Sequence, residues 1–261
     1  MKPELFDIHS HLNFPQFNED RDEIIRKMRE KGIWTICVGV DEETSRECLS
    51  LAESAGADGG IFAAVGKHPT ERGEDFNVDY FRALAERPKA VAIGECGLDM
   101  FRREKSDLKR QKQIFKKQIE LALELDKPLI IHCRDAHEET ADILSAYAGR
   151  GLKGNIHFFS GGWKDARKYL GMGFSISFAG PITFTNEYDE VIKKAPMEKI
   201  MAETDSPFAA PVPHRGKRSE PLFVGEIVKK IASVRKISYN EASRALSENA
   251  LKLFLENGIN E

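Results

Sequence analysis

Two histidines separated by one residue lie near the start of the chain, in Asp7-Ile8-His9-Ser10-His11. An apolar pair, Leu5-Phe6, precedes them, so the stretch is typical of a β-strand end. Because successive strand side chains point to opposite faces, Asp7, His9 and His11 are expected on one side. Two imidazoles so placed can bind one metal ion, with Asp7 supporting them rather than touching the ion. Taken alone, the pattern is more typical of a polar strand end with two solvated histidines.

Further metal-binding or acid–base side chains come directly after short apolar runs. Glu95 follows one such run and His132 another, and burying either group without a cation or several donors is costly. His68, before a proline, could instead be a loop histidine, and Asp205 could be a helix N-cap. The candidate set, which holds five of the seven histidines, is His9, His11, His68, Glu95, His132, His157 and Asp205.

A mixed set of imidazoles and carboxylates suits two divalent metal ions that share a bridging carboxylate and a bridging water molecule. Ions in this arrangement activate water near neutral pH and stabilise the attacking and leaving oxygens of a displacement. The set therefore predicts hydrolysis of an ester, an amide or a phosphodiester. It does not decide between Mg, Mn and Zn.

Basic residues follow several of the same runs and predict a positive rim around the site. Arg134 comes two residues after His132, and its planar fork of N–H donors matches phosphate oxygens. The net charge of −3 argues against a general electrostatic grip on nucleic acid, but a local rim favours a phosphate-bearing substrate. Taken individually, Lys217 and Arg218 are typical of a solvated loop. The other candidates for the rim are Lys67, Arg102, Arg103, His214, Arg215, Lys217 and Arg218.

Apolar runs that alternate with longer helical stretches must position these residues. Strands are expected at residues 4–9, 33–40, 61–65, 90–95, 128–132, 153–157, 173–177 and 199–203. Helices are expected at residues 19–31, 41–55, 78–87, 106–126, 163–170, 186–194 and 221–234, with a further one after Asp135 and a last one to residue 256. Asp135 to Glu138 and Ser238 to Glu241 have the pattern of capping boxes.

Strands and helices that alternate in this way predict an α/β fold, a single-domain (β/α)8 TIM barrel over residues 1–261. The alternative is a doubly wound open sheet, but its Gly-x-Gly-x-x-Gly turn does not follow the first strand. Strand ends of a barrel meet on one face, so the candidate residues are expected to form one site. Side chains expected in the core rather than in the site are Met172, Phe174, Phe178 and Phe184.

The composition, with 41% hydrophobic and 31% charged residues, is that of a soluble globular protein. No apolar window approaches a membrane span, and His9 comes too early for a secretory signal. The four cysteines show no Cys-x-x-Cys pairing and are expected to be buried reduced thiols. The expected location is the cytoplasm, with no membrane attachment and no obligate protein partner.

Taken in order, these motifs resemble those of the TatD-related metal-dependent hydrolases, which belong to the amidohydrolase superfamily of distorted (β/α)8 barrels. The resemblance runs nearly end to end. Met100-Phe101-Arg102 and Ser219 depart from the family pattern, and because they lie in substrate loops they leave the substrate open. The motifs that carry the resemblance are Asp7-Ile8-His9-Ser10-His11, Gly66-Lys67-His68-Pro69, Gly94-Glu95-Cys96-Gly97-Leu98-Asp99, Ile131-His132-Cys133-Arg134-Asp135, His157-Phe158-Phe159-Ser160-Gly161, Ile176-Ser177-Phe178-Ala179-Gly180-Pro181, Glu203-Thr204-Asp205-Ser206-Pro207 and Arg215-Gly216-Lys217-Arg218-Ser219-Glu220-Pro221.

The resemblance implies a role for each residue. One divalent ion would be held by His9, His11 and Asp205, the other by His132 and His157, and Glu95 would bridge the two. Asp205 would also be the general base, His68 and Arg134 would face the scissile phosphate, and Glu203 would tune the site.

The implied activity is that of a DNase, often a 3′-to-5′ exonuclease on single-stranded ends, with an ion such as magnesium. Two alternatives stay open. One is a metal-dependent ester or amide hydrolase, such as a D-aminoacyl-tRNA deacylase. The other is a binding protein that keeps the ions structurally.

Overall fold

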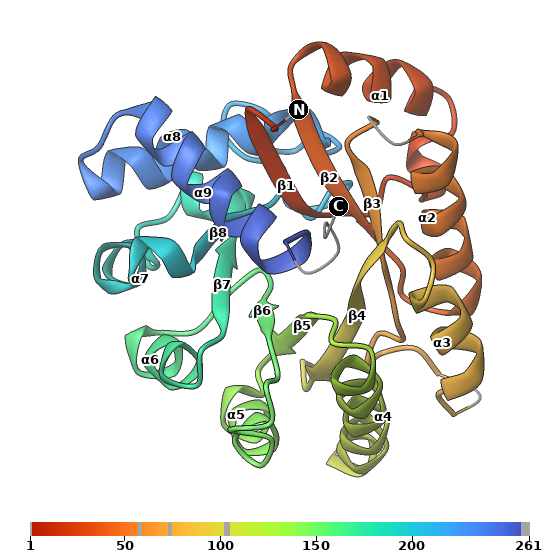
Figure 1. The fold of residues 1–261 in the computed structure, drawn as a ribbon. Coiled ribbons are helices and arrows are strands. Elements are labelled where there is room, and N and C mark those ends of the chain that lie inside the picture. Colours follow the sequence, from red (N-terminus) through yellow and green to blue (C-terminus); the bar gives the residue numbers. More distant parts are fainter. Residues whose placement is uncertain (1, 57–58, 73–74, 102–104, 257–261) are drawn as a thin grey trace.

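Eight parallel strands stand side by side in chain order, and helices cover their outer side (Figure 1). The computed structural model describes residues 2–56, 59–72, 75–101 and 105–256. The predicted (β/α)8 barrel is confirmed. Its strands are β1 (Leu5–Ser10), β2 (Ile33–Val38), β3 (Ile61–Val65), β4 (Ala90–Asp99), β5 (Leu129–Arg134), β6 (Gly154–Ile156), β7 (Ser175–Phe178) and β8 (Ile200–Ala202).

The barrel closes between β1 and the segment that follows β8. The backbone N–H of His11 donates to the carbonyl of Ser206 at 2.7 Å, and the N–H of Asp205 donates to the carbonyl of His9 at 2.9 Å. Because β8 is only three residues long, the closing bonds come from the loop beyond it. The seam therefore joins the two segments that carry His9, His11 and Asp205.

The helices begin and end close to where the sequence predicts them. The Ser238–Glu241 capping box is confirmed, whereas the predicted box at Asp135–Glu138 is wrong. Asp135 has a left-handed backbone with φ of 53°, so the helix begins after Ala136 without a side-chain cap. The helices are α1 (Arg21–Glu30), α2 (Glu42–Ser54), α3 (Val78–Ala85), α4 (Lys105–Glu124), α5 (His137–Ser145), α6 (Trp163–Gly171), α7 (Asp189–Lys194), α8 (Val224–Arg235) and α9 (Tyr239–Phe254), with 3-10 turns η1 (Pro15–Phe17), η2 (Gly180–Thr183), η3 (Met197–Lys199) and η4 (Pro221–Phe223).

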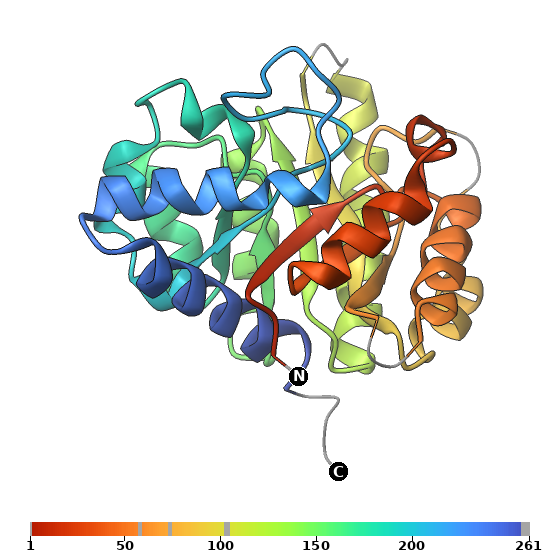
Figure 2. The ribbon, with the colours of Figure 1, turned by 90° about the horizontal axis from the view of Figure 1, so that it is seen from above.

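Apolar side chains fill both the barrel interior and the layer between the strands and the helices. Inside the barrel, Phe6, Ile36 and Ile130 pack in one cluster with Phe254 near the end of α9. Figure 2 shows α9 at the same end of the barrel as the N-terminus, while the loop after β8 lies at the opposite end. With one end closed by α9, the carboxyl ends of the strands form the open face.

Strand β4 is longer than predicted, since it runs to Asp99 instead of ending at Glu95. The pairing of β4 with β5 changes register between Ile93 and Cys96, which marks a bulge. Bulges of this kind re-aim a side chain, and here the re-aimed residue is Glu95. Only glycine fits at position 97, because a Cβ there would lie 2.0 Å from the carbonyl oxygen of His132. The glycines of this segment therefore continue the strand rather than end it.

One of the predicted core residues is at the surface. Phe174 and Phe178 are buried, and Met172 is half-buried, but Phe184 is 41% exposed. Strand β7 ends at Phe178, and the 3-10 turn η2, which contains Pro181, comes between it and Phe184.

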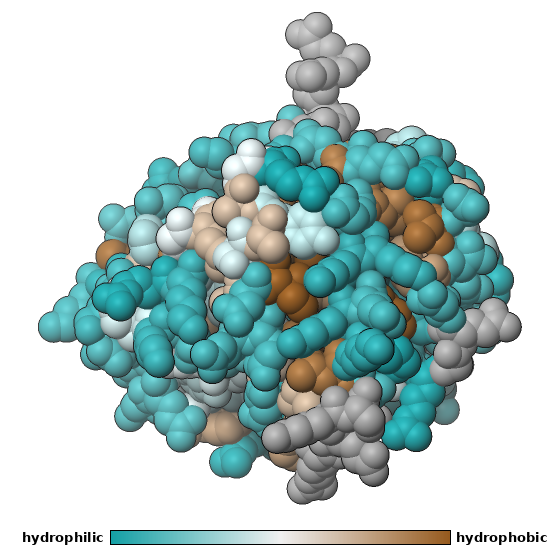
Figure 3. All heavy atoms as spheres, turned by 90° about the horizontal axis from the view of Figure 1, so that it is seen from below, coloured by the Kyte–Doolittle hydropathy of each residue, from teal (hydrophilic) through white to brown (hydrophobic). Residues whose placement is uncertain are grey.

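One side of the molecule is mostly hydrophilic. Figure 3 shows a side of the molecule on which hydrophilic residues predominate and hydrophobic ones show in patches between them. Over the part of the chain that the structure describes, no helix has the length and apolar character needed to cross a bilayer.

Candidate metal centre

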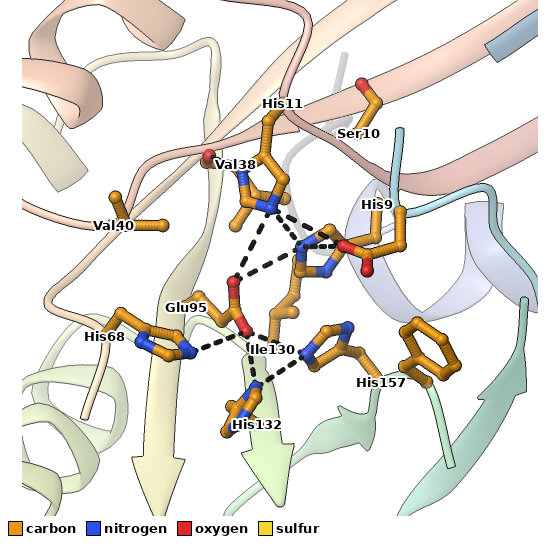
Figure 4. A network of polar contacts seen from close by, with 12 residues as sticks. His9, Ser10, His11, Val38, Val40, His68, Glu95, Ile130, His132 and His157 are labelled. Carbon is orange, nitrogen blue, oxygen red and sulfur yellow. Dashed lines mark hydrogen bonds and ion pairs between the residues drawn. The ribbon is translucent and has the colours of Figure 1, made fainter. Parts of the chain in front are cut away.

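All seven predicted site residues meet at the open face of the barrel. His9 belongs to β1 and His11 follows it, while Glu95 and His132 belong to β4 and β5. His68, His157 and Asp205 follow β3, β6 and β8. Figure 4 shows the five imidazoles pointing toward Glu95 from these separate elements. The sequence prediction that these positions converge is therefore correct.

The two carboxylate oxygens of Glu95 face two different groups of nitrogens. Oε1 lies 2.8 Å from Nδ1 of His132 and 2.8 Å from Nε2 of His157. Oε2 lies 3.4 Å from Nε2 of His9 and 3.8 Å from Nε2 of His11. One carboxylate thus stands between two pairs of imidazoles, which is the position of a bridging ligand.

Each pair of imidazoles presents two nitrogens to a common point. Nε2 of His9 and Nε2 of His11 are 3.2 Å apart, and Nδ1 of His132 and Nε2 of His157 are 3.3 Å apart. Oδ1 of Asp205 adds a carboxylate to the first pair, 3.5 Å from Nε2 of His11. The donor atoms of His9, His11 and Asp205 all lie within 4.8 Å of one another.

Partners on the far side of the rings determine which nitrogen carries the proton. Nδ1 of His11 lies 2.8 Å from the carbonyl oxygen of Val38, and Nε2 of His132 lies 2.9 Å from Oδ2 of Asp99. Both partners only accept, so these outer nitrogens are protonated and the inner ones present lone pairs. An imidazole whose outer N–H is held by a carbonyl or carboxylate is the usual form of a metal ligand.

His68 has the opposite arrangement. Its Nδ1 accepts from the backbone N–H of Thr70 at 3.2 Å, and Oγ1 of Thr70 lies 2.7 Å away. A backbone amide can only donate, so Nδ1 carries the lone pair and, in the neutral ring, Nε2 carries the proton. That Nε2 lies 3.3 Å from Oε1 of Glu95. His68 therefore offers an N–H to the site, whereas His11 and His132 offer lone pairs.

The carboxylates of the centre stay ionised despite their burial. Burial alone would raise the pKa of Glu95, but the neighbouring His157, His68 and His132 together hold that pKa well below its usual value. Burial opposes ionisation of Asp205 as well, but the neighbouring His11 and His9 hold its pKa below the usual value. The centre therefore presents negative charge to a cation.

Two buried carboxylates outside the ligand set hold the surrounding loops. Asp7, whose pKa burial raises, accepts from the backbone N–H of Thr204 at 2.8 Å and from that of His9 at 3.3 Å. Glu203 accepts from the backbone N–H of Phe158 at 2.6 Å, and its Oε1 lies 3.4 Å from Nδ1 of His157. Asp7 thus contacts the backbone of His9, and its role as a support of both histidines stays a prediction.

Asp99 is a site residue to which the sequence assigned no role. Because β4 was expected to end at Glu95, Asp99 appeared to lie in a loop, yet β4 carries it to the edge of the site beside His132. Burial would raise the pKa of Asp99, but the hydrogen bond from His132 holds it below its usual value.

Replacing Asp99 with Asn is expected to weaken metal binding or activity about 10- to 100-fold, because the charge that fixes the His132 proton on Nε2 is lost. Titration of metal-depleted protein with Mn²⁺ measures the change. The matched control is Asp142→Asn, at an exposed carboxylate on α5. Equal affinities in the two variants would show that Asp99 does not orient the ligand.

The centre opens into a cavity of about 890 Å³ whose wall includes the predicted cation Arg134. The exposed Arg134 guanidinium lies 3.7 Å above the ring centroid of Phe101. Arg218 pairs with Asp20 through two hydrogen bonds, so it fastens its loop to the segment before α1 and contributes less to a rim. Arg102 and Arg103 lie outside the described residues.

The donor set fits divalent cations. Imidazole nitrogens and carboxylate oxygens converge in three overlapping groups, which are His9, His11 and Asp205; His9, Glu95 and His157; and His68, Glu95 and His132. Nitrogen and oxygen ligands in this mixture suit first-row divalent ions as well as magnesium. A parallel barrel with such a centre at the carboxyl ends of its strands has the architecture of a metal-dependent hydrolase.

Comparison with known proteins identifies the family. The model of the TatD-related DNases matches residues 6–255, and the chain belongs to this family of metal-dependent hydrolases. It is 38% identical over 255 residues to an uncharacterized metal-dependent hydrolase, YabD, of Bacillus subtilis, with 96% of this chain and 98% of the relative covered. It is 32% identical to the 3′-5′ ssDNA/RNA exonuclease TatD of Pantoea vagans, with 96% and 99% covered.

A solved structure shares the fold. The crystal structure of YJJV, a TatD homolog from Escherichia coli, is similar with a TM-score of 0.87 at 28% identity, over 97% of this chain and 99% of that one. The two chains therefore share the barrel over nearly all of the residues compared.

Proposed function

We propose that this protein is a divalent-metal-dependent exonuclease that removes nucleotides from the 3′ ends of single-stranded DNA. The observation that carries the proposal is the position of Glu95, whose two oxygens face separate pairs of imidazoles. The name of the Pantoea vagans relative, an exonuclease on single strands, supports the choice of substrate. Arg134 on the cavity wall favours a phosphate group there.

In this proposal His9, His11 and Asp205 would hold one cation, His132 and His157 would hold a second, and Glu95 would be a ligand of both. When bound, the divalent cations supply the Lewis acidity that activates water and neutralises charge on the phosphate. The protein holds the ligand nitrogens in place beforehand through the contacts on the outer sides of the rings. Mg, Mn and Zn are all compatible with the donor set.

The remaining residues handle protons and charge. Asp205, ionised and beside His11, takes the proton of the attacking water as general base. His68 donates its Nε2–H to a phosphate oxygen, where negative charge grows during the reaction. Arg134 binds a phosphate of the strand through its guanidinium fork. The catalytic set is then Asp205, Glu95, His68 and Arg134.

Substitutions of Thr70 test the role of His68 as an N–H donor. Replacing Thr70 with Val leaves the backbone donor but removes the hydroxyl that lies 2.7 Å from Nδ1. One hydrogen bond of this kind is worth about 1 kcal/mol, so kcat is expected to fall about two- to tenfold with little change in KM. Thr70→Ser, which keeps the hydroxyl, is expected to restore it. Nitrogen-15 shifts of His68 that place the proton on Nδ1 in the wild type would contradict this assignment.

We place the reaction in the cytoplasm. The four cysteines are buried and unpaired, as in proteins of reducing compartments. Fractionation of the native host cells, followed by detection of the protein, measures this directly.

The proposed function is tested with a 3′-labelled single-stranded oligonucleotide, assayed beside simple esters and charged tRNAs under the same Mg²⁺ or Mn²⁺ concentrations. The largest kcat/KM is expected for the oligonucleotide, with label released from the 3′ end. Faster turnover of an ester or of an aminoacyl-tRNA would replace the nuclease with the carboxylic-ester alternative.

A further inference from the structure

Two phenylalanine rings line the cavity beside the His11 side of the metal centre. Phe14 lies in the loop after β1 and Phe208 in the loop after β8, with ring centroids 6.3 Å apart. Phe14 stacks on the His11 imidazole at a centroid distance of 4.6 Å, with the two planes 16° apart. The ring of Phe208 meets the same imidazole edge-on at 6.1 Å. Phe14 and Phe208 are called the aromatic shelf below.

Core packing does not account for the exposed ring of the shelf. Phe208 is 48% exposed, although burying a phenylalanine side chain contributes roughly 1.5–3 kcal/mol. The backbone holds it there, because the N–H of Phe208 donates to the carbonyl of Asp205 at 2.9 Å. The turn that positions Asp205 thus also presents an aromatic face to the cavity, directly beside the proposed site of reaction.

The aromatic shelf and the Arg134 guanidinium lie on opposite walls of the cavity. Phe14 and Phe208 come from the loops after β1 and β8, whereas Phe101 and Arg134 come from the ends of β4 and β5. In a barrel whose strands follow chain order, these two pairs of strands face each other across the axis. The cavity, about 890 Å³, is in the range of pockets that enclose a ligand of nucleotide size and leaves room beyond the ions and one phosphate.

The order of groups across the cavity is therefore an aromatic face, the metal centre and a guanidinium. A nucleic acid strand offers the complementary order of a base, the scissile phosphate and a neighbouring phosphate. Flat bases stack on aromatic side chains whatever their sequence, and guanidinium groups bind phosphates. A substrate without a base, such as a simple phosphodiester or an aliphatic ester, would leave the shelf in contact with water.

We propose that the aromatic shelf is a nucleobase-binding subsite, in which a base next to the scissile bond stacks on Phe208. This inference rests on the proposed nuclease function and specifies its substrate. A base in a duplex is paired and covered by its neighbours, so only an unpaired base can lie on the ring. The shelf thus selects single-stranded ends and, because stacking reads no base edge, accepts all four bases.

The test compares complete oligonucleotides with versions that lack one base on either side of the scissile phosphate. Phe208→Ala is expected to raise KM for the complete oligonucleotide about 5- to 150-fold, the range found for loss of one base stack, and to leave kcat within about threefold. With the oligonucleotide that lacks the stacked base, wild type and variant are expected to give equal KM. Phe208→Trp, which restores a flat ring, is expected to return KM to the wild-type range.

The matched control is Tyr239→Ala, at an aromatic residue of similar exposure (37%) at the start of α9. Its hydroxyl lies near the α8 residue Gly225, on the side of β1 where Leu5 begins the strand. It is expected to change neither KM nor kcat. Phe208→Leu keeps apolar bulk without a flat face, is expected to behave like Phe208→Ala, and serves if the alanine variant fails to fold.

Direct binding separates the two proposals. The fluorescent base 2-aminopurine is placed where loss of the base makes the KM of wild type and Phe208→Ala equal, or else at the 3′ end. Its fluorescence is expected to be quenched on binding to wild type and not on binding to Phe208→Ala. An unchanged KM in Phe208→Ala, or an equal loss on the oligonucleotide that lacks the base, would overturn the subsite while the nuclease stands. If wild type cleaved no oligonucleotide, the proposed nuclease function would be wrong. The presence or absence of 2-aminopurine quenching would then confirm or contradict the subsite by itself.

Discussion

Replacing Glu95 with Gln is expected to lower kcat for oligonucleotide hydrolysis by more than about 100-fold, beyond the effect of removing an outer partner of a ligand. The oxygens of Glu95 face both pairs of imidazoles, at 2.8 Å from His132 and 3.4 Å from His9. A neutral amide cannot bridge two cations, because it carries no negative charge and has only one oxygen. Its NH₂ group would instead donate to the lone pair of a neighbouring imidazole. Elemental analysis of the purified variant is expected to show fewer ions per chain than the wild type.

The matched control for Glu95 is Glu187→Gln, at an exposed carboxylate in the loop before α7. Wild-type kcat and metal content are expected for it. A Glu95→Gln variant that retains full metal content and at least a third of wild-type kcat would show that the centre is not built around this carboxylate.

Replacing Asp205 with Asn is expected to lower kcat about 10²- to 10⁴-fold, the range for losing a general base. Asp205 is held ionised by His11 and His9 and cannot be replaced in proton transfer by an amide. Unlike the Glu95 change, this substitution leaves His132, His157 and Glu95 intact. The variant is therefore expected to retain the ion bound there.

Saturating Mn²⁺ separates the two roles of Asp205. If Asp205 only bound metal, a high concentration of the ion would restore activity. The expected result is that kcat stays low at every Mn²⁺ concentration, while the metal content rises. Recovery to within tenfold of wild type would contradict a role for Asp205 as the base.

The sequence is sufficient for the barrel and for the convergence of its seven candidate residues, because both follow from local patterns. Alternation along β1 correctly places His9 and His11 on one side, and their Nε2 atoms lie 3.2 Å apart. Chain order alone then brings the strand ends together, since each strand of a (β/α)8 barrel pairs with the next.

Features that depend on an irregular backbone could not be predicted from the sequence. The bulge near Glu95 carries β4 on to Asp99, whereas the sequence pattern ends this strand at Glu95. The tautomer of His68 depends on the backbone N–H of Thr70, which no residue pattern specifies. The aromatic shelf joins Phe14 to Phe208 from opposite ends of the chain, so only closure of the barrel reveals it.

The proposed reaction depends on two cations held on either side of Glu95. Its most direct test is to titrate metal-depleted protein with Mg²⁺ or Mn²⁺ and to measure, on the same samples, the ions bound per chain and the rate of hydrolysis of a 3′-labelled single-stranded oligonucleotide. The predicted result is no hydrolysis without metal and a rate that rises until two ions are bound. Full activity in metal-free protein, or no hydrolysis with two ions bound, would contradict this dependence on two cations.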